Sequence, residues 1–466
     1  MAGTSEAPTV LIMAAGEGTR MRSSLPKVLH PVCGRPMIAW PVHAAQEAGA
    51  GRVLVIVGPT HDLSAGLPEG TETVIQPEAN GTGGAMIAAI EAIEASEEVV
   101  VLSGDHPLLG VETISELIET HRSEEAAATV MTVEMDDPGT YGRIVRDADG
   151  GVERIAETKH PENVPQEILD LGEINTGTYC FHGPSFATAL GRITPENEAG
   201  ELYLGDTLPL LREDGHKIAA YVASDPNVNL GVNTRTDLAL VTTEARRKIA
   251  ERHMLSGVTI VDPASTWIDA EVEIAQDAVI EPGTALRGQT KIGSGSTIGP
   301  HTTILSSEVG SESTILRSHL DAARVDDNCT VGPFSYLRPG AHLQNGSKAG
   351  AFVEIKNSEI GEGAKVPHLA YVGDTDIGAD ANLGAGSITA NYDGKAKHRT
   401  KIGEGARIGV NNSLVAPVEI GEGAYTGAGA VIRSDVPPGS LGVTDAAQRN
   451  IEDYAERKSG EADGEK

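Results

Sequence analysis

An aliphatic residue recurs at every sixth position through much of the C-terminal half of this chain, and a glycine often follows it. A period of six matches neither an α-helix, which repeats at about 3.6 residues, nor an alternating strand, which repeats at two. It matches a β-solenoid whose coils have short flat sides with one inward aliphatic residue each. We therefore predict a parallel β-helix, in preference to a glycine-rich β-sandwich with accidental spacing. The positions that set the period include Ile274, Ile280, Leu286, Ile292, Ile298, Ile304, Ile402, Ile408, Leu414 and Ile420.

The composition agrees with a solenoid and limits the partners of the protein. Only 3% of the residues are aromatic, and stacked coils can bury one another's aliphatic residues without a large aromatic core. The formal net charge of −31 argues against nucleic acid as a general partner, so an anionic substrate would need a local basic pocket. Cys33, Cys180 and Cys329 lie far apart without metal-binding spacing, which predicts buried thiols in a reducing compartment.

The N-terminal segment shows no targeting pattern. Residues 1–8 contain no basic stretch, and the apolar run from Val10 to Ala15 is far too short to span a bilayer. The sequence therefore predicts a soluble, cytoplasmic protein without membrane insertion.

The first half of the chain alternates strand-like and helix-like segments. Strands are predicted at residues 9–15, 53–57, 99–102 and 128–133, and helices after Pro36 and over residues 85–95 and 111–121. Such alternation is typical of a mostly parallel, doubly wound α/β sheet, whose ligand lies at the carboxyl ends of the strands. A helix over residues 237–255, ending at Gly257, is predicted to connect this sheet to the β-helix.

Basic residues accompany a glycine-rich turn at the end of the first predicted strand. Residues 14–21 read Ala-Ala-Gly-Glu-Gly-Thr-Arg-Met, and Lys27 follows shortly afterwards. The spacing fits neither a dinucleotide fingerprint nor a Walker A loop. Arg20 and Lys27 beside the backbone N–H groups of this turn form an anion cradle suited to a nucleoside triphosphate. A tight turn with solvated charges is the plainer alternative.

A carboxylate stands at another predicted strand end. Asp105 follows Ser103-Gly104, and on its own it could be only a helix cap. Near a triphosphate it would be a suitable Mg²⁺ ligand, because Mg²⁺ prefers hard oxygen donors and usually takes only one or two from the protein. Asn233 is the candidate for a second ligand.

The six-residue register breaks after Gly386 and resumes only at Ile402. Insertions in repeat arrays map to loops, often on the binding face. His368 lies just upstream, and three cations of this acidic chain fall near the interrupted coils: Arg338, Lys356 and Lys397. A lone histidine is usually structural, but a base beside phosphate-binding cations suits an acceptor that is both an amine and a phosphate ester.

Taken in order, these motifs resemble the bifunctional N-acetylglucosamine-1-phosphate uridylyltransferase/glucosamine-1-phosphate N-acetyltransferase family. The resemblance runs from about residue 9 to about residue 445. It implies a Rossmann-like nucleotidyltransferase domain followed by a left-handed parallel β-helix of hexapeptide repeats. The motifs that carry it in the first half are Ala14-Ala15-Gly16-x-Gly18-Thr19-Arg20-Met21, Lys27, Gln76, Gly81-Thr82, Gly104-Asp105, Tyr141-Gly142-Arg143, Glu157, Glu173-Ile174-Asn175-Thr176-Gly177 and Gly231-Val232-Asn233.

By this resemblance, the first half transfers uridylyl from UTP to N-acetylglucosamine-1-phosphate and releases pyrophosphate. Arg20 and Lys27 would hold phosphates, and Asp105 and Asn233 would hold Mg²⁺, so that catalysis depends on positioning and charge neutralisation. Uracil would lie at residues 76, 81 and 82, and the sugar at residues 142, 157 and 175. The full implied nucleotide-sugar set is Ala14, Ala15, Gly16, Gly18, Lys27, Gln76, Gly81, Thr82, Gly142, Glu157, Asn175 and Asn233.

The same resemblance implies that the β-helix acetylates the amine of glucosamine-1-phosphate directly from acetyl-CoA. His368 would be the general base, with Glu354 as a candidate to orient it, and a homotrimer would form the site between neighbouring subunits. Val410 and Asp445 depart from the family pattern on the coenzyme side. The implied residues are Arg338, Lys356, Tyr371, Asn382 and Lys397 for the amino-sugar phosphate, and Ala385, Asn391, Tyr392, Val410 and Ala428 for acetyl-CoA.

The predicted domains are a uridylyltransferase over 1–235, a helical linker over 236–257, an acetyltransferase β-helix over 258–448 and a charged, unstructured tail over 449–466. The implied product, UDP-N-acetylglucosamine, is a cell-wall and lipopolysaccharide precursor. One alternative is a single-activity sugar-1-phosphate nucleotidyltransferase with a structural β-helix, which would not require the His368 set. A non-enzymatic scaffold is the other, and it would leave the cradle residues unexplained.

Overall fold

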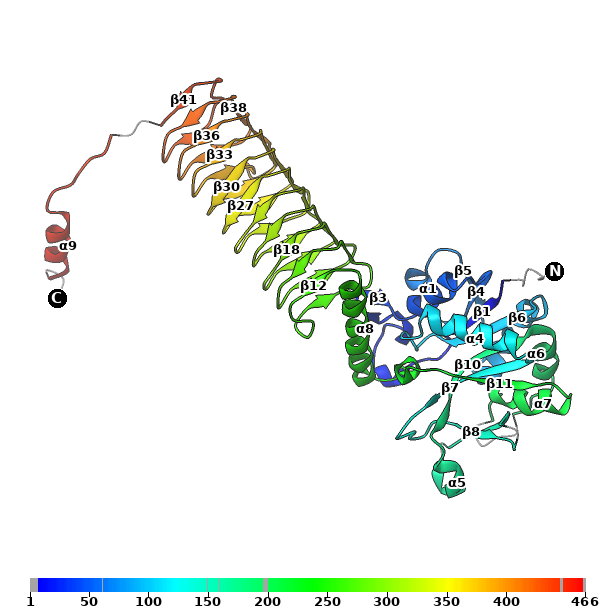
Figure 1. The fold of residues 1–466 in the computed structure, drawn as a ribbon. Coiled ribbons are helices and arrows are strands. Elements are labelled where there is room, and N and C mark those ends of the chain that lie inside the picture. The colour runs from blue at the N-terminus through cyan, green and yellow to red at the C-terminus, as the bar shows by residue number, and fades with distance from the viewer. Residues whose placement is uncertain are drawn as a thin grey trace. The chain divides into compact units, whose positions relative to one another are not determined.

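The computed structural model describes residues 7–463, apart from residues 61, 149, 159, 196–199, 445 and 446. The chain forms two compact units, Met1–Ile249 and Ala250–Lys466, which are described separately below (Figure 1). The domain limits predicted at residues 235, 257 and 448 stay predictions.

The first unit is built on one mixed sheet. Four neighbouring strands of this sheet are parallel: β6 (Glu98–Ser103), β1 (Thr9–Met13), β4 (Arg52–Val57) and β5 (Thr71–Ile75). Strand β10 (Glu173–His182) runs antiparallel between β6 and β7 (Ala128–Glu134). The predicted doubly wound α/β fold is thereby confirmed, with one reversed strand. In sheet order the strands are β11 (Ile218–Val222), β7 (Ala128–Glu134), β10 (Glu173–His182), β6 (Glu98–Ser103), β1 (Thr9–Met13), β4 (Arg52–Val57) and β5 (Thr71–Ile75), with β8 (Arg143–Arg146) and β9 (Val152–Ala156) beside β10.

Helices cover both faces of this sheet because successive side chains of each strand point to opposite sides. Val10 and Ile12 pack in one buried cluster with α1 (Ala39–Glu47) and α4 (Val111–Ser123), and Leu11 packs in the other. The helix predicted over 85–95 is interrupted at Ala89, which leaves the helical conformation. The helices of the second face are α2 (Thr82–Ala88), α3 (Ile90–Glu94), α6 (Gly183–Leu190) and α7 (Thr207–Glu213).

Strand register brings two predicted functional segments side by side. Met13 at the end of β1 pairs with Ser103 at the end of β6. The glycine-rich turn after β1 and Asp105 after β6 therefore start from neighbouring positions at one edge of the sheet. This is the edge at which a doubly wound sheet binds ligands.

The connecting helix α8 spans Arg235–Leu255, close to its predicted limits. Val241, Ala245 and Ile249, each four residues from the next, are buried along one side of this helix. Gly257 follows with a φ of 91°, a left-handed conformation in which glycine is favoured.

The second unit is a parallel β-helix with three sheets, as predicted (Figure 1). The first sheet has 11 strands, from β12 (Thr259–Ile260) to β41 (Leu441–Gly442). The second has 10, from β13 (Trp267–Ile268) to β40 (Val431–Ile432), and the third has 9, from β14 (Glu273–Ile274) to β38 (Val418–Ile420).

The inward aliphatic residues stack in register from coil to coil. In the first sheet, Ile280 pairs with Ile298 and Ile298 with Ile315, and all three are fully buried. Each coil therefore covers the apolar residues of the next, which is how the period of six stabilises a fold with few aromatic residues.

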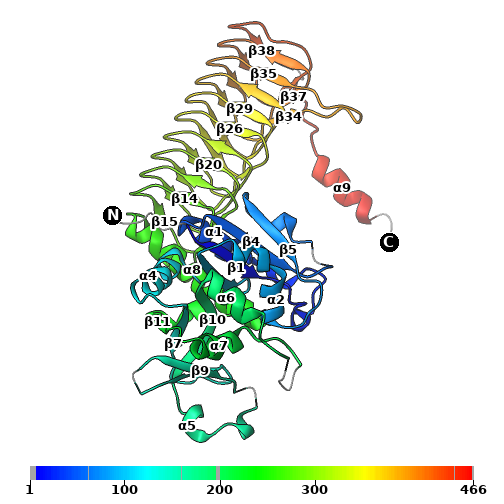
Figure 2. The ribbon, with the colours of Figure 1, turned by 90° about the vertical axis from the view of Figure 1, so that its right-hand side faces the viewer.

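The predicted insertion lies between β34 (Ile388–Ala390) and β35 (Thr400–Ile402). It projects from the coils as a narrow loop (Figure 2), in which Tyr392 pairs antiparallel with Lys397. Asp393 accepts hydrogen bonds from the backbone N–H groups of Lys395 and Ala396, each at 2.7 Å, which closes the tip of the loop.

The C-terminal tail differs from the prediction of an unstructured segment. It contains a helix, α9, over Tyr454–Asp463. Alanine, glutamate, arginine and lysine favour helix formation even at high charge, and Lys458 lies over the ring of Tyr454 one turn earlier. Asp445, the predicted departure at the coenzyme side, lies outside the described residues.

Two further predictions concern the whole chain. Cys33, Cys180 and Cys329 are all buried, as predicted. Among the residues that the structure describes, no helix combines the length and the apolar character needed to cross a membrane.

Candidate functional site

The four residues predicted to hold phosphate and metal form one connected cluster in the first unit. The Lys27 Nζ atom lies 2.5 Å from Asp105 Oδ2 and 3.5 Å from Asn233 Oδ1. Arg20 donates to the same Asn233 oxygen at 2.8 Å. These residues come from the segment after β1, the segment after β6 and the segment just before α8. The fold therefore brings together residues that are far apart in the sequence.

Backbone contacts fix the two oxygen-bearing residues of this cluster. The Val232 N–H donates to the Asp105 carbonyl at 3.0 Å, and Asp237 accepts from the backbone N–H groups of Asn233 and Thr234 at 3.0 and 2.8 Å. Burial raises the pKa of Asp105, but the charges of His106 and Lys27 outweigh it and hold that pKa below its ordinary value. Asp105 is therefore a fixed carboxylate.

The cluster also fits a divalent cation. Asp105 Oδ2 and Asn233 Oδ1 both point at the Lys27 ammonium, so two hard oxygen donors converge on a position where a positive charge is already held. Within the described ranges, no group of three or more His, Cys, Asp or Glu side chains could hold a metal. Two protein ligands suit Mg²⁺, which commonly completes its shell with phosphate and water.

A cavity of about 280 Å³ opens beside this cluster. Glycines at its edge have physical reasons to be glycine: a Cβ on Gly18 would lie 2.5 Å from the Lys27 Cβ, and one on Gly81 would lie 2.5 Å from the Leu202 carbonyl oxygen. The predicted nucleotide residues that line the cavity are Ala14, Ala15, Gly16, Lys27, Gln76, Gly81, Thr82 and Asp105.

Gln76, which lines this cavity, is held in a single orientation. The side chain is buried, and Nε2 donates to Asn80 Oδ1 at 3.0 Å and to the Gly81 carbonyl at 3.2 Å. Both amide protons are thereby used, and the oxygen of the amide remains as an acceptor.

The three predicted sugar residues lie together at the β8–β10 edge, although none lines the 280 Å³ cavity. The backbone N–H of Asn175 donates to the Gly142 carbonyl at 2.9 Å, and a Cβ on Gly142 would lie 3.7 Å from Glu157 Oε1. Asn175 Nδ2 donates to the Tyr179 hydroxyl at 2.9 Å, next to a register shift in β10.

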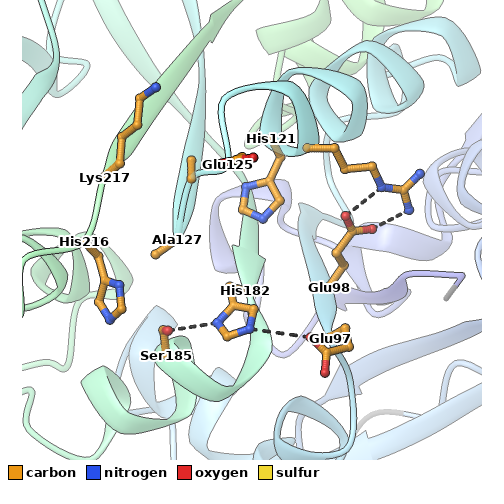
Figure 3. A pocket seen from close by; sticks show the side chains of 11 residues that line it. Glu97, Glu98, His121, Glu125, Ala127, His182, Ser185, His216 and Lys217 are labelled. Atoms are coloured by element: carbon orange, nitrogen blue, oxygen red, sulfur yellow. Dashed lines mark hydrogen bonds and ion pairs between the residues drawn. The ribbon is translucent and has the colours of Figure 1, made fainter. Parts of the chain in front are cut away.

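A larger cavity of about 830 Å³ lies at the opposite end of the sheet (Figure 3). Its walls include Glu98, the first residue of β6, and the histidines His121, His182 and His216. His121 is buried with Nδ1 at 3.0 Å from Thr129 Oγ1, and burial lowers its pKa to about 4. None of the predicted site residues lines this cavity. The volume of a cavity therefore does not by itself identify the active site of this unit.

In the second unit, His368 and three of the predicted acetyl-CoA residues occupy one column. Register places Ala385 above His368, Val410 above Ala385 and Ala428 above Val410 in successive coils. Backbone hydrogen bonds follow the column, such as Gly386 N–H to the His368 carbonyl and Asn411 N–H to the Ala385 carbonyl. His368 ends β30 (Lys365–His368) and is exposed.

The predicted phosphate-binding cations gather at the other end of the second sheet. Arg338 and Lys356 are stacked neighbours, because Leu337 in β25 (Tyr336–Leu337) pairs with Ile355 in β28 (Glu354–Lys356). Lys397 of the insertion contacts Lys356, and this contact and the like charge lower the pKa of Lys397. Two ammonium groups held together are typical of an anion site.

Within a single chain Glu354 lies beside Arg338, and its expected role in orienting His368 stays a prediction. Its Oε1 accepts from Arg338 NH1 at 2.8 Å, and no hydrogen bond joins it to His368 within the described part of this single chain. The residue belongs to the cation cluster, because it stacks between Tyr336 and Tyr371 on the outer face of the second sheet.

Comparison with known proteins decides the family. Residues 10–167 match a MobA-like NTP transferase domain, and residues 399–434 match the bacterial transferase hexapeptide family. The bifunctional protein GlmU of Mycobacterium bovis is 45% identical over 459 residues, covering 96% of this chain and 92% of its own length. The bifunctional protein GlmU of Streptomyces avermitilis is 46% identical over 460 residues, covering 96% and 94%. This chain belongs to the bifunctional GlmU family.

Membership of the GlmU family confirms several predictions. The first half is a nucleotidyltransferase, the second is a left-handed hexapeptide-repeat acyltransferase, and one bifunctional enzyme contains both. A solved UDP-glucose pyrophosphorylase in complex with UDP-glucose also matches 52% of this chain and 100% of its own, at a TM-score of 0.42 and 17% identity.

A buried carboxylate beside the predicted residues of the second unit was not anticipated from the sequence. Asp374 is 7% exposed and accepts from Asn357 Nδ2 at 2.6 Å and from Asn391 Nδ2 at 2.5 Å. The three residues are 17 positions apart, one coil from the next. A search for polar residues recurring at the coil length, rather than at six, would have found them.

Proposed function

We propose that this enzyme makes UDP-N-acetylglucosamine in two steps. The β-helix transfers acetyl from acetyl-CoA to glucosamine-1-phosphate, and the α/β unit then transfers uridylyl from UTP to the product and releases pyrophosphate. The observation that carries the proposal is the Arg20–Asn233 and Lys27–Asp105 cluster beside a cavity that Gln76 lines.

Base selection in this proposal belongs to Gln76. Uracil carries a ring N–H between two carbonyls, and the Gln76 amide oxygen is the acceptor that this N–H requires. Because Nε2 is already bound to Asn80 and Gly81, the amide cannot turn to offer a donor instead. The sugar hydroxyls would meet Glu157 and Asn175 at the β8–β10 edge.

Phosphoryl chemistry at the first site depends on charge and position. The sugar-phosphate oxygen attacks the α-phosphorus of UTP in line, and pyrophosphate leaves. Lys27 and Arg20 would bind the phosphates, drawing the Lys27 ammonium away from Asp105. Asp105 and Asn233 would hold Mg²⁺, which supplies charge neutralisation at the phosphates when bound.

Acetyl transfer in the proposal uses His368 as the base. His368 accepts a proton from the amine, whose nitrogen attacks the thioester carbonyl, and CoA leaves as the thiolate. Arg338, Lys356 and Lys397 would bind the phosphate of the amino sugar, with Tyr371 and Asn382 beside it. Ala385, Tyr392, Val410 and Ala428 would contact the coenzyme.

A homotrimer is proposed because one chain keeps the two halves of this site apart. His368 and the Lys356–Lys397 pair lie at opposite ends of β31 (Tyr371–Gly373), which alone spans roughly 10 Å at about 3.3 Å per residue. The amine and phosphate of glucosamine-1-phosphate are on neighbouring ring carbons, so base and cations must meet around one sugar. Contact between different corners of two copies is heterologous and closes into a ring.

An exposed apolar ridge supports the same assembly. Phe334, Phe352 and Leu369 are 54%, 58% and 63% exposed at one corner of three successive coils, and the two phenylalanine rings stack at 5.2 Å. All three have a left-handed φ, which is costly for a bulky residue. A second copy of the chain would cover this ridge. A cytoplasmic location is proposed because the three cysteines are buried thiols outside any disulfide, as in proteins of a reducing compartment.

A single assay tests the proposed function against the single-activity alternative. Purified protein is supplied with glucosamine-1-phosphate, acetyl-CoA, UTP and Mg²⁺, and free thiol and pyrophosphate are followed separately. We expect both, with pyrophosphate release dependent on acetyl-CoA. Pyrophosphate release from supplied N-acetylglucosamine-1-phosphate without any thiol release in the full mixture would establish the alternative, in which the β-helix is structural.

A further inference from the structure

A ladder of polar side chains crosses three coils beside the second site. Asn357 from the coil below and Asn391 from the insertion above each donate to one oxygen of the Asp374 carboxylate, at 2.6 and 2.5 Å. Asp374 is nine-tenths buried, and Asn391 is 8% exposed. Both carboxylate oxygens are therefore bound by neutral amides, and the charge itself is left uncompensated by these contacts.

The backbone of Asp374 joins the end of the insertion to the coil below. Its carbonyl accepts from the Thr400 N–H at 3.1 Å, where the insertion returns to the coil, and its N–H donates to the Lys356 carbonyl at 3.0 Å. Together with the Asn391 side chain, these contacts fix the start and the end of the loop that carries Tyr392 and Lys397. The preceding Gly373 leaves no room for a side chain, because a Cβ there would lie 2.5 Å from the Tyr371 hydroxyl and 2.7 Å from Asn391 Nδ2.

The charge of Asp374 acts on the lysine pair. Lys356 lowers the pKa of Lys397, and Asp374 opposes this effect. Burial raises the pKa of Asp374, but the two asparagines and then Lys356 and Lys397 bring it below its ordinary value, so the carboxylate stays ionised. Without bound phosphate, a buried negative charge next to two ammonium groups offsets their repulsion.

We propose that Asp374 is a positioning residue of the acetyl-transfer site, which fixes Asn391 against the coenzyme thioester and keeps the Lys356–Lys397 pair together and charged for the substrate phosphate. The proposal rests on the proposed function. The competing explanation is that Asp374 has only a structural role, as the hydrogen-bond acceptor for two asparagines at a corner of the β-helix.

The backbone of Asp374 allows a clean substitution. Its φ is 50°, and the equivalent corner two coils earlier is Gly340, with a φ of 77°. Asp374→Gly therefore removes the side chain at a position where glycine is already accepted by the fold. Asp374→Asn keeps the size but replaces the charge and leaves one asparagine donor facing another donor. Asp380→Asn is the matched control, since Asp380 is an exposed carboxylate with a φ of 54° at the next corner of the same coil.

We expect both Asp374 variants to raise the KM for acetyl-CoA by about tenfold, the cost of an unpaired buried donor, while uridylyl transfer by the same preparations is unchanged. Loss of the negative charge lowers the pKa of Lys397 further. As the pH is raised above neutral, the KM for glucosamine-1-phosphate should therefore begin to increase at a lower pH in the variants than in the parent enzyme. Asp380→Asn should match the parent in both measurements.

Two results would overturn the inference. Folded Asp374→Gly with an unchanged KM for acetyl-CoA and an unchanged pH dependence of the KM for glucosamine-1-phosphate would show that the residue has only a structural role. Equal losses of uridylyl and acetyl transfer in that variant would show a general folding role. A parent enzyme that releases no thiol at all would instead refute the proposed function, so the two failures are distinct.

Discussion

The Lys27 ammonium lies 2.5 Å from the Asp105 carboxylate, and both side chains are largely buried, at 12% and 21% exposure. The lysine thus occupies the position where Asp105 and Asn233 would bind a cation. Phosphate binding and cation binding at this site are therefore coupled through the cations that would bind phosphate. Lys27 must leave Asp105 Oδ2, and Arg20 must leave Asn233 Oδ1, before both oxygens can bind a cation.

Replacing Lys27 by methionine should separate these two effects. Uridylyl transfer should fall by more than about 10²-fold, because a phosphate contact is lost. Mg²⁺ should bind the nucleotide-free variant about tenfold more tightly than the parent, because Asp105 loses its competitor. Isothermal titration with Mg²⁺ alone measures the second effect. Arg154→Met, which removes an exposed cation of β9, serves as the control, and equal Mg²⁺ affinity in all three proteins would contradict the coupling.

Asp105→Ala should abolish pyrophosphate release and leave acetyl transfer nearly intact. The carboxylate belongs to the first unit, and none of the proposed acetyl-transfer residues lies in that unit. Thiol release and pyrophosphate release from the same preparation make each activity the control for the other. A parallel loss of both would refute the assignment of two separate sites.

His368→Ala should lower acetyl transfer by about 10²-fold or more, the usual contribution of a general base. Uridylylation of supplied N-acetylglucosamine-1-phosphate should not change. In the parent enzyme the acetyl-transfer rate should fall at acidic pH as His368 takes up a proton, and this acidic limb should disappear in the variant. His319→Ala changes an exposed histidine in another sheet of the β-helix and is the control. Full acetyl transfer in His368→Ala would make His368 a surface residue without a catalytic role.

The apolar ridge gives a test of assembly. Phe352→Glu places a charge at 58% exposure on the surface that a second copy would cover, so sedimentation should show a trimer for the parent and smaller species for the variant. Acetyl transfer should be lost with the trimer, and uridylyl transfer should persist. Val261→Glu changes an equally exposed position outside the ridge and should remain trimeric. An active monomer would disprove the shared site.

The buried His121 predicts acid sensitivity of the first unit. Burial lowers its pKa from 6.5 to about 4, so between these pH values the unfolded chain takes up a proton that the folded chain does not. Stability should therefore fall as the pH falls through this window, by up to about 3 kcal/mol at about 1.4 kcal/mol per pKa unit.

Urea unfolding followed by the fluorescence of Trp40, in a Trp267→Phe background, reports on the first unit. His121→Asn should have a smaller pH dependence while retaining a partner for Thr129, and His30 and His106, whose pKa values burial also lowers, would supply part of the remainder. His216→Asn, at the same cavity but exposed, should keep it. An identical pH dependence in all three proteins would mean that His121 is not the group responsible.

Much of the fold follows from the sequence because its periodicities are strong. The period of six predicts the inward column of Ile280, Ile298 and Ile315, and the interruption before Ile402 predicts the insertion. The reversed direction of β10 could not be predicted, because a strand pattern is the same in both directions. The α9 helix was missed because high charge was weighted above local helix propensity.

The site was predictable as a set of residue types and less so as a geometry. Lys27, Asp105 and Asn233 were expected near one nucleotide, but the ion pair that closes the cation position was not. Asp374 escaped notice because its role depends on which residues stack, and stacking is set by the length of each coil rather than by a local motif.

Gly340, Asn357 and Asp374 occupy the same corner of three consecutive coils, with φ values of 77°, 46° and 50°. Such a corner requires a left-handed backbone but leaves the side chain open to glycine, asparagine or aspartate. New polar contacts could therefore be introduced into this β-helix one coil at a time, by choosing among these three residues at each corner without changing the core.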